Sequence, residues 1–141
     1  MINVINSSTK KVSPAFIQKW VKAVYKELDR MNGTSLHLEK IDLTVVFLNV
    51  APAKKLNMQF RKKNYATDIL SFAGDLEDSL GELVLCSQVL QKQAKEHKLT
   101  FNEELGYMLT HGVLHLMGFD HEKSKKEAKI MHDIQDFIFD K

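Results

Sequence analysis

The 141-residue sequence contains a single cysteine, Cys86, and only two prolines. One cysteine excludes both an internal disulfide and a zinc centre built from several cysteines. Apolar runs are also short, with residues 45–48 among the longest, and none approaches the length of a membrane span. The first residues lack a basic region followed by a long apolar stretch, so we expect no signal peptide and a cytoplasmic protein.

An excess of one charge is absent too, because 20 Lys and Arg face 18 Asp and Glu, for a net charge of +2. So small an excess does not by itself indicate a nucleic-acid partner. No repeat, low-complexity tract or Pro/Gly/Ser linker divides the chain. With 44% hydrophobic and 27% charged residues, residues 1–141 are expected to form one globular domain.

Hydrophobic periodicity predicts an α+β fold, in which a small mixed β-sheet packs with about five helices. Ser13 and Pro14 are residue types that begin a helix, and Gly33 is the type that ends one. The acidic segment 75–81 is expected to form the long loop of a hairpin. Strands are expected at residues 2–5, 41–50, 69–72 and 82–86, and helices at residues 14–30, 52–62, 87–97, 102–117 and 124–139.

The most informative stretch of the sequence carries three histidines, His111, His115 and His121. The first two are four residues apart, so on a helix their imidazoles share one face, one turn apart. Gly118 is a residue type that ends a helix in the left-handed conformation, which allows the chain to return His121 to the same place. Three imidazoles with one open position are typical of catalytic zinc. We therefore predict one Zn²⁺ per chain, on a helix and the turn that follows it.

The spacing of these histidines also matches the metzincin metalloproteases, except that Gly112 stands where those enzymes have a glutamate as general base. Without that carboxylate, peptide hydrolysis lacks its usual means of activating water. A glycine inside a helix indicates either a close approach of another group or substrate, or ordinary tight packing. Cys86 is interpreted as a small buried residue rather than a fourth ligand. Asp120 is a candidate partner for one of the imidazoles.

Three further segments extend the pattern beyond the histidines, at residues 56–61, 67–72 and 81–83. Together with residues 110–121 they resemble the YbeY family of bacterial endoribonucleases, over about residues 40–131. The sequence departs mildly from the family pattern at Ala73, Glu82 and Phe119, where proline, aspartate and tyrosine are common. The resemblance implies a zinc-dependent endoribonuclease that prefers single strands and matures the 3′ end of 16S ribosomal RNA. It also implies a part in ribosome quality control, with a small-subunit ribosomal protein and a ribosome-assembly GTPase as partners.

A phosphate-binding role is expected for Arg61. A guanidinium group can bind phosphate oxygens in pairs and stabilise charge that develops on them, and the resemblance implies that Arg61 is catalytic. Phe60 and Tyr65 could stack on unpaired bases, although we expect Phe60 to pack in the core. Lysines near Arg61 are candidate RNA-binding residues, namely Lys54, Lys55, Lys62 and Lys63. A second basic group follows the histidines, at Lys123, Lys125, Lys126 and Lys129.

The sequence leaves the general base and the attacking group open. Asp68, Glu82 and Asp120 are candidates for the base, and either water or the substrate's 2′-hydroxyl could attack. Two other functions stay open beside the endoribonuclease. One is a zinc peptidase or amidohydrolase, which the glycine at position 112 disfavours. The other is a non-catalytic ribosome-assembly factor whose metal stabilises the fold.

Overall fold

The computed structural model describes residues 1–33, 35–118 and 132–133. A mixed sheet and helices in one α+β domain agree with the predicted fold, while the predicted helix at 124–139 lies outside the described residues. The elements in chain order are β1 (Ile2–Asn6), α1 (Pro14–Asn32), the 3-10 helix η1 (Leu38–Lys40), β2 (Asp42–Leu48), α2 (Val50–Arg61), β3 (Ile69–Ala73), β4 (Ser79–Cys86), α3 (Ser87–Glu96) and α4 (Phe101–Leu116).

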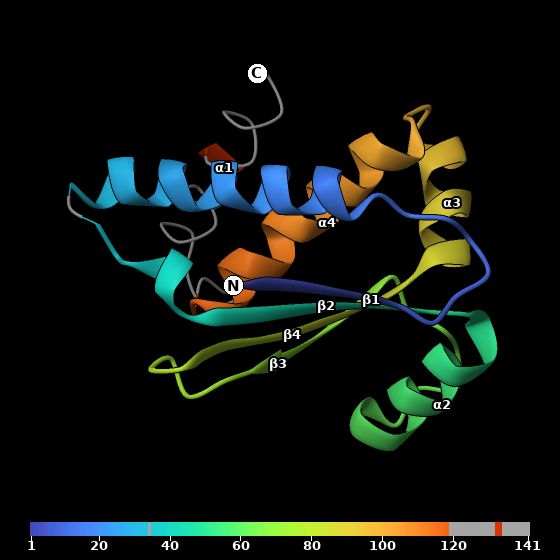
Figure 1. Ribbon diagram of the computed structural model, residues 1–141. Coiled ribbons are helices and arrows are strands. Elements are labelled where there is room, and N and C mark those ends of the chain that lie inside the picture. The colour runs from blue at the N-terminus through green and yellow to red at the C-terminus, as the bar shows by residue number, and fades with distance from the viewer. Residues whose placement is uncertain (34, 119–131, 134–141) are drawn as a thin grey trace.

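The sheet has the strand order β1-β2-β4-β3, so β3 lies at one edge. The pairs β1–β2 and β2–β4 are parallel, whereas β3 runs antiparallel to β4. Helices α1 and α4 cover one face of the sheet, and α2 lies on the other side, at one end (Figure 1). This arrangement separates the histidine-bearing helix from the helix that carries Arg61.

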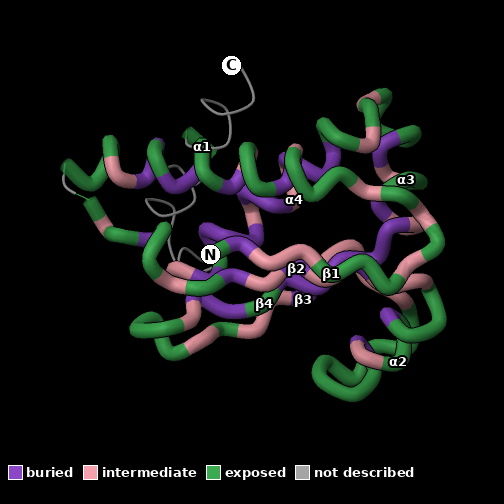
Figure 2. Tube along the Cα trace, viewed as in Figure 1, coloured by how far each residue is buried: buried purple, intermediate pink, exposed green. Residues whose placement is uncertain are grey.

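Buried residues are frequent in the sheet and in the two helices that cover it, α1 and α4 (Figure 2). Helix α1 begins at Ser13, whose hydroxyl accepts a hydrogen bond from the Phe16 amide, and it ends at Gly33 in the left-handed conformation. Both helix signals predicted from the sequence are thus confirmed. The core includes Ile17, Val21, Val24 and Leu28 of α1, Leu43 and Val45 of β2, Leu83 and Leu85 of β4, and Leu105, Leu109 and Val113 of α4.

A direct polar contact joins α1 to α4. The indole Nε1 of Trp20 donates a hydrogen bond of 3.0 Å to Thr110 Oγ1, and that hydroxyl in turn donates to the carbonyl of Gly106. A Cβ atom at position 106 would lie 2.8 Å from Trp20 Cε2, so glycine allows this close contact. The hydrogen bond to Thr110 and the close contact at Gly106 therefore fix the position of α4, which carries the histidines, against α1.

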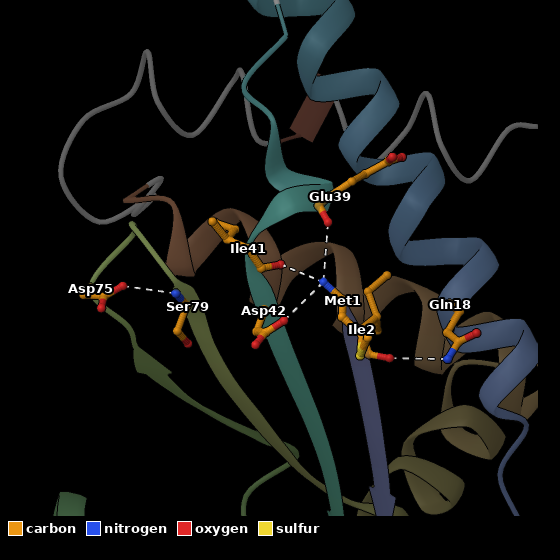
Figure 3. Close-up of polar contacts among 8 residues, drawn as sticks. All are labelled: Met1, Ile2, Gln18, Glu39, Ile41, Asp42, Asp75 and Ser79. Atoms are coloured by element: carbon orange, nitrogen blue, oxygen red, sulfur yellow. Dashed lines mark hydrogen bonds and ion pairs between the residues drawn. The ribbon is translucent and has the colours of Figure 1, made fainter.

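The N-terminal residue ties β1 to its neighbours (Figure 3). The Met1 ammonium donates to the carbonyls of Glu39 and Ile41 at 3.4 and 3.1 Å and forms an ion pair of 3.3 Å with Asp42. The Gln18 amide of α1 donates to the carbonyl of Ile2 at 3.3 Å.

Within the described residues, no helix combines the length and apolar composition that crossing a membrane requires.

The loop between β3 and β4 is shorter than predicted, because β4 already begins at Ser79. Its Asp75 carboxylate accepts hydrogen bonds from three backbone amides, those of Glu77, Asp78 and Ser79, at 2.9 to 3.0 Å (the last is drawn in Figure 3). These backbone hydrogen bonds hold the pKa of Asp75 below its usual value. Residues 79–81 extend the hairpin, since their backbone pairs with neighbouring strands.

Candidate active site

Two of the three predicted metal ligands lie one turn apart on α4, at His111 and His115. The helix begins with a capping box, in which the Thr100 and Glu103 side chains each accept from the other residue's backbone amide. It ends where the Gly118 amide donates to the His115 carbonyl, with Gly118 at φ 91°. The predicted helix stop is confirmed.

The third predicted ligand, His121, lies outside the described residues, as do Asp120 and the basic group after it. Among the residues that the structure describes, no three His, Cys, Asp or Glu side chains gather closely enough to hold a metal ion. The three-histidine site therefore stays a prediction, of which the described part supplies two imidazoles on one helix face.

Tight packing against the sheet explains Gly112. A Cβ atom at this position would lie 2.7 Å from Leu83 Cδ2 and 2.9 Å from Ile69 Cδ1. Such distances are shorter than real Cβ contacts, so glycine lets α4 pack this close to β3 and β4 without displacing the Leu83 and Ile69 side chains. Of the two explanations that the sequence left open, the structure supports packing of the helix rather than space for a substrate.

Ser71 completes the described part of the site, and the sequence analysis gave it no role. Its hydroxyl lies 2.7 Å from Nδ1 of His115. In the tautomer in which Nδ1–H donates to the Ser71 hydroxyl, this hydrogen bond fixes the orientation of the imidazole and leaves the unprotonated Nε2 of His115 to bind an external group. Histidine ligands of metals usually have such a partner at the second nitrogen. The residues present therefore fit a zinc ion, which has a preference for imidazole nitrogen.

The close packing at Gly112 and the contact at Ser71 belong to one arrangement. Ser71 lies opposite Leu83 in the β3–β4 register, so both side chains point to the α4 face of the sheet. Leu83 also limits the space at Gly112. The depth at which α4 packs on the sheet thus sets the distance between His115 and Ser71.

Arg61 is the last residue of α2 and is exposed. Lys62 follows in the left-handed conformation at φ 57°, and its amide donates to the Met58 carbonyl. No acidic residue occurs from position 50 to position 67. The candidate RNA-binding lysines are all exposed in this same segment, at Lys54, Lys55, Lys62 and Lys63. The structure thus brings Arg61 and these lysines together on and just after one helix, where their roles stay predictions.

The expectation that Phe60 packs in the core is wrong, because 57% of its surface is exposed. Helix α2 meets the sheet only near one end, so Phe60 reaches past the covered region. Its ring contacts Phe72 of β3 edge to face, with 5.1 Å between the centroids. Phe72 directly follows Ser71 but points to the opposite face of the sheet. The edge strand β3 therefore contacts His115 through Ser71 on one face and Phe60 of α2 through Phe72 on the other.

The candidate general bases differ in position. Glu82 lies opposite Phe72 in the strand register, and side-chain alternation turns it away from α4. Glu82 therefore points to the same face of the sheet as Phe72, which contacts Phe60 of α2, and its role as a base stays a prediction. The Asp68 carboxylate accepts from the Ile69 amide at 2.8 Å and from the Thr67 hydroxyl at 3.3 Å, so it already organises the start of β3.

One further expectation from the sequence is confirmed. Cys86 is buried, with 1% of its surface exposed, as expected for a small core residue. His97 stands at the end of α3. Its Nδ1 lies 2.6 Å from the buried Glu104 carboxylate of α4, a partner that the sequence did not indicate. This contact fixes the start of α4 to α3.

Known proteins resemble this chain over nearly its whole length. A family model described as endoribonuclease YbeY matches residues 3–141. A protein of that name from Bdellovibrio bacteriovorus is 52% identical over 137 residues, which cover 97% of this chain and 91% of the relative. One from Persephonella marina is 37% identical over 87% of this chain and 82% of the relative. The solution structure of a Thermotoga maritima protein has a TM-score of 0.63 and 28% identity, covering 99% of this chain and 87% of that one.

Proposed function

This chain belongs to the endoribonuclease YbeY family, and on that premise we propose that it hydrolyses phosphodiester bonds within single-stranded RNA with the help of a metal ion. The observation that carries the proposal is the pair His111 and His115, one turn apart on α4, with Ser71 at Nδ1 of His115. This arrangement leaves a ring nitrogen free to bind a metal ion. It supports a metal-dependent enzyme over a purely structural role for this helix.

Zinc is the proposed metal, one ion per chain, with His111, His115 and His121 as its ligands. A bound zinc ion supplies Lewis-acid polarisation of a phosphoryl oxygen and lowers the pKa of bound water to about 7. Ser71 keeps the His115 ring in the orientation that the ligand role requires. Close packing at Gly112, between the two histidines, brings this part of α4 against β3 and β4.

Arg61 is the proposed catalytic residue that binds the phosphate. Its planar guanidinium matches the geometry of two phosphate oxygens and stabilises the negative charge that grows on them during cleavage. The lysines at positions 54, 55, 62 and 63 are the proposed contacts to neighbouring phosphates. Support comes from their exposure and from the absence of acidic residues at positions 50–67.

The proposed substrate is ribosomal RNA, at the 3′ end of the 16S molecule, within ribosome quality control. The proposed partners are the small ribosomal subunit, one of its proteins and a ribosome-assembly GTPase, in the cytoplasm. Support for these finer assignments is the family membership together with the name endoribonuclease that the relatives carry. They are tested with purified subunits as substrate, by mapping the cleaved end.

The decisive experiment is cleavage of a single-stranded ribosomal RNA fragment by purified protein, before and after removal of metal by a chelator. We expect cleavage that stops without metal, returns with zinc and is lost in His115→Ala, which also controls for contaminating nucleases. A 2′,3′-cyclic phosphate product would identify the 2′-hydroxyl as the attacking group, whereas 5′-phosphate and 3′-hydroxyl ends would identify water. RNA binding without turnover would refute the proposal and favour the non-catalytic assembly factor.

The role of Arg61 needs a separate measurement. Arg61→Ala should lower RNA cleavage at least about tenfold, because loss of a group that stabilises transition-state charge typically costs several kcal/mol. Metal content and thermal stability should change little, since Arg61 is exposed at the end of α2. Cleavage at the wild-type rate would contradict the catalytic role.

A further inference from the structure

Exposed apolar side chains are concentrated on and just after α2. Of eight exposed large hydrophobic side chains in the described residues, four fall within residues 50–65. Two of these four are aromatic, Phe60 with 57% and Tyr65 with 55% of the surface exposed. Single exposed apolar residues are ordinary, but four of them within residues 50–65 set this segment apart from the rest of the described surface.

The Phe60 ring and the backbone of Tyr65 are held in place, although both aromatic side chains are exposed. Phe60 rests edge to face against Phe72, with an angle of 74° between the rings, which occupies only part of each ring. Tyr65 is fixed through its backbone, because the fully buried Asn57 side chain donates 2.7 Å to the Tyr65 carbonyl. The Lys63 amide also bonds to the Asn57 carbonyl, at 3.4 Å. Binding to these residues therefore requires little further ordering of the protein.

The charge around these aromatics selects the kind of partner. Residues 50–67 carry five positive and no negative side chains, and the basic ones are exposed: Lys54, Lys55, Arg61, Lys62 and Lys63. An apolar protein surface would leave these charges unmatched. Single-stranded RNA offers phosphates to the basic side chains and unpaired bases to the rings. A duplex offers only phosphates there, because its bases are stacked on one another.

We propose that Phe60 and Tyr65 form a stacking platform for unpaired RNA bases, and that this platform makes the protein select single strands over duplexes. The inference rests on the proposed RNA-cleaving function and names the residues that determine its substrate form. Phe72 supports the Phe60 ring from β3, and Asn57 supports the loop that carries Tyr65. The neighbouring Arg61, Lys62 and Lys63 hold the phosphates that join the stacked bases.

The test compares two substitutions at position 60. Phe60→Leu keeps an apolar contact with Phe72 but removes the aromatic face, whereas Phe60→Trp keeps an aromatic face. A fluorescein-labelled oligoadenylate and an RNA hairpin duplex serve as probes, with EDTA present to prevent cleavage. Phe60→Leu should weaken oligoadenylate binding about 5- to 150-fold, the loss expected for one base–aromatic stack. Its duplex binding should stay within about twofold of wild type, and Phe60→Trp should bind oligoadenylate like wild type.

Leu76→Ala is the matched control, because Leu76 is also 57% exposed but lies in the β3–β4 loop, outside the basic segment. This variant should bind both probes like wild type. In Phe60→Trp, the emission added by the new indole should fall when oligoadenylate binds. Unchanged oligoadenylate affinity in Phe60→Leu, equal weakening for both probes, or unquenched emission in Phe60→Trp would overturn the platform. Failure of the wild-type protein to bind oligoadenylate would instead overturn the proposed function.

Discussion

Substitution of Gly112 by alanine tests whether packing depth of α4 governs the site. The added Cβ would lie 2.7 Å from Leu83 Cδ2 and 2.9 Å from Ile69 Cδ1. Overpacking of this kind typically costs about 1–3 kcal/mol. The alanine also favours the helix by about 1 kcal/mol relative to glycine. We therefore expect Gly112→Ala to lower the free energy of unfolding by about 1 kcal/mol net.

Urea unfolding measures this change, since small single domains generally unfold in one cooperative step. A second variant, Leu83→Val, removes the Cδ atoms that the new methyl group would meet. If the steric argument holds, Gly112→Ala costs less in the Leu83→Val background than in wild type, with a coupling of about 0.5 kcal/mol or more. An unfolding free energy equal to or above that of the wild type would refute the reasoning, because it would show that the helix had room for a methyl group.

Three further outcomes are expected. Ser71→Ala should weaken zinc binding about 10- to 100-fold in a competition with a coloured chelator, because His115 loses its orienting partner; Ser71→Thr should restore it, and equal affinity in Ser71→Ala would exclude the orienting role. Asp75→Ala should lower the thermal midpoint at pH 7, because the backbone hydrogen bonds that lower the pKa of Asp75 stabilise the fold only while the carboxylate is ionised. The difference from wild type should therefore disappear as the pH falls through the lowered pKa, and a pH-independent difference would contradict this. His97→Ala should destabilise the fold by about 1–3 kcal/mol in urea unfolding, because it strands the buried Glu104 carboxylate; unchanged stability would show that water replaces the imidazole.

Local signals in the sequence predicted the elements well. The cap at Ser13, the stop at Gly33 and the four-residue spacing of His111 and His115 each depend on neighbours within one or two helical turns. Interactions of this range are set by residue type and spacing alone. The sequence alone therefore predicted that His111 and His115 lie on one face of a helix.

The contacts that complete the site could not be read in the same way. Ser71 and His115 are separated by 44 positions and meet only because β3 takes the sheet edge beneath α4. Phe60 follows Leu56 at a spacing typical of a buried helix face, yet α2 covers only one end of the sheet. Glu82 was different, since alternation beside the apolar Leu83 already indicated that the two face opposite ways.

The contact between α1 and α4 has a practical consequence for every variant described above except Phe60→Trp, which adds a second indole. Trp20 is the only tryptophan of the chain, and its indole donates to Thr110, the residue immediately before His111. Native emission therefore comes from the interface that holds the histidine helix, not from an average over the molecule. The fluorescence of Trp20 in unlabelled protein therefore reports whether α4 is packed on α1. A variant whose Trp20 emission matches that of the wild type has kept this contact while its activity is measured.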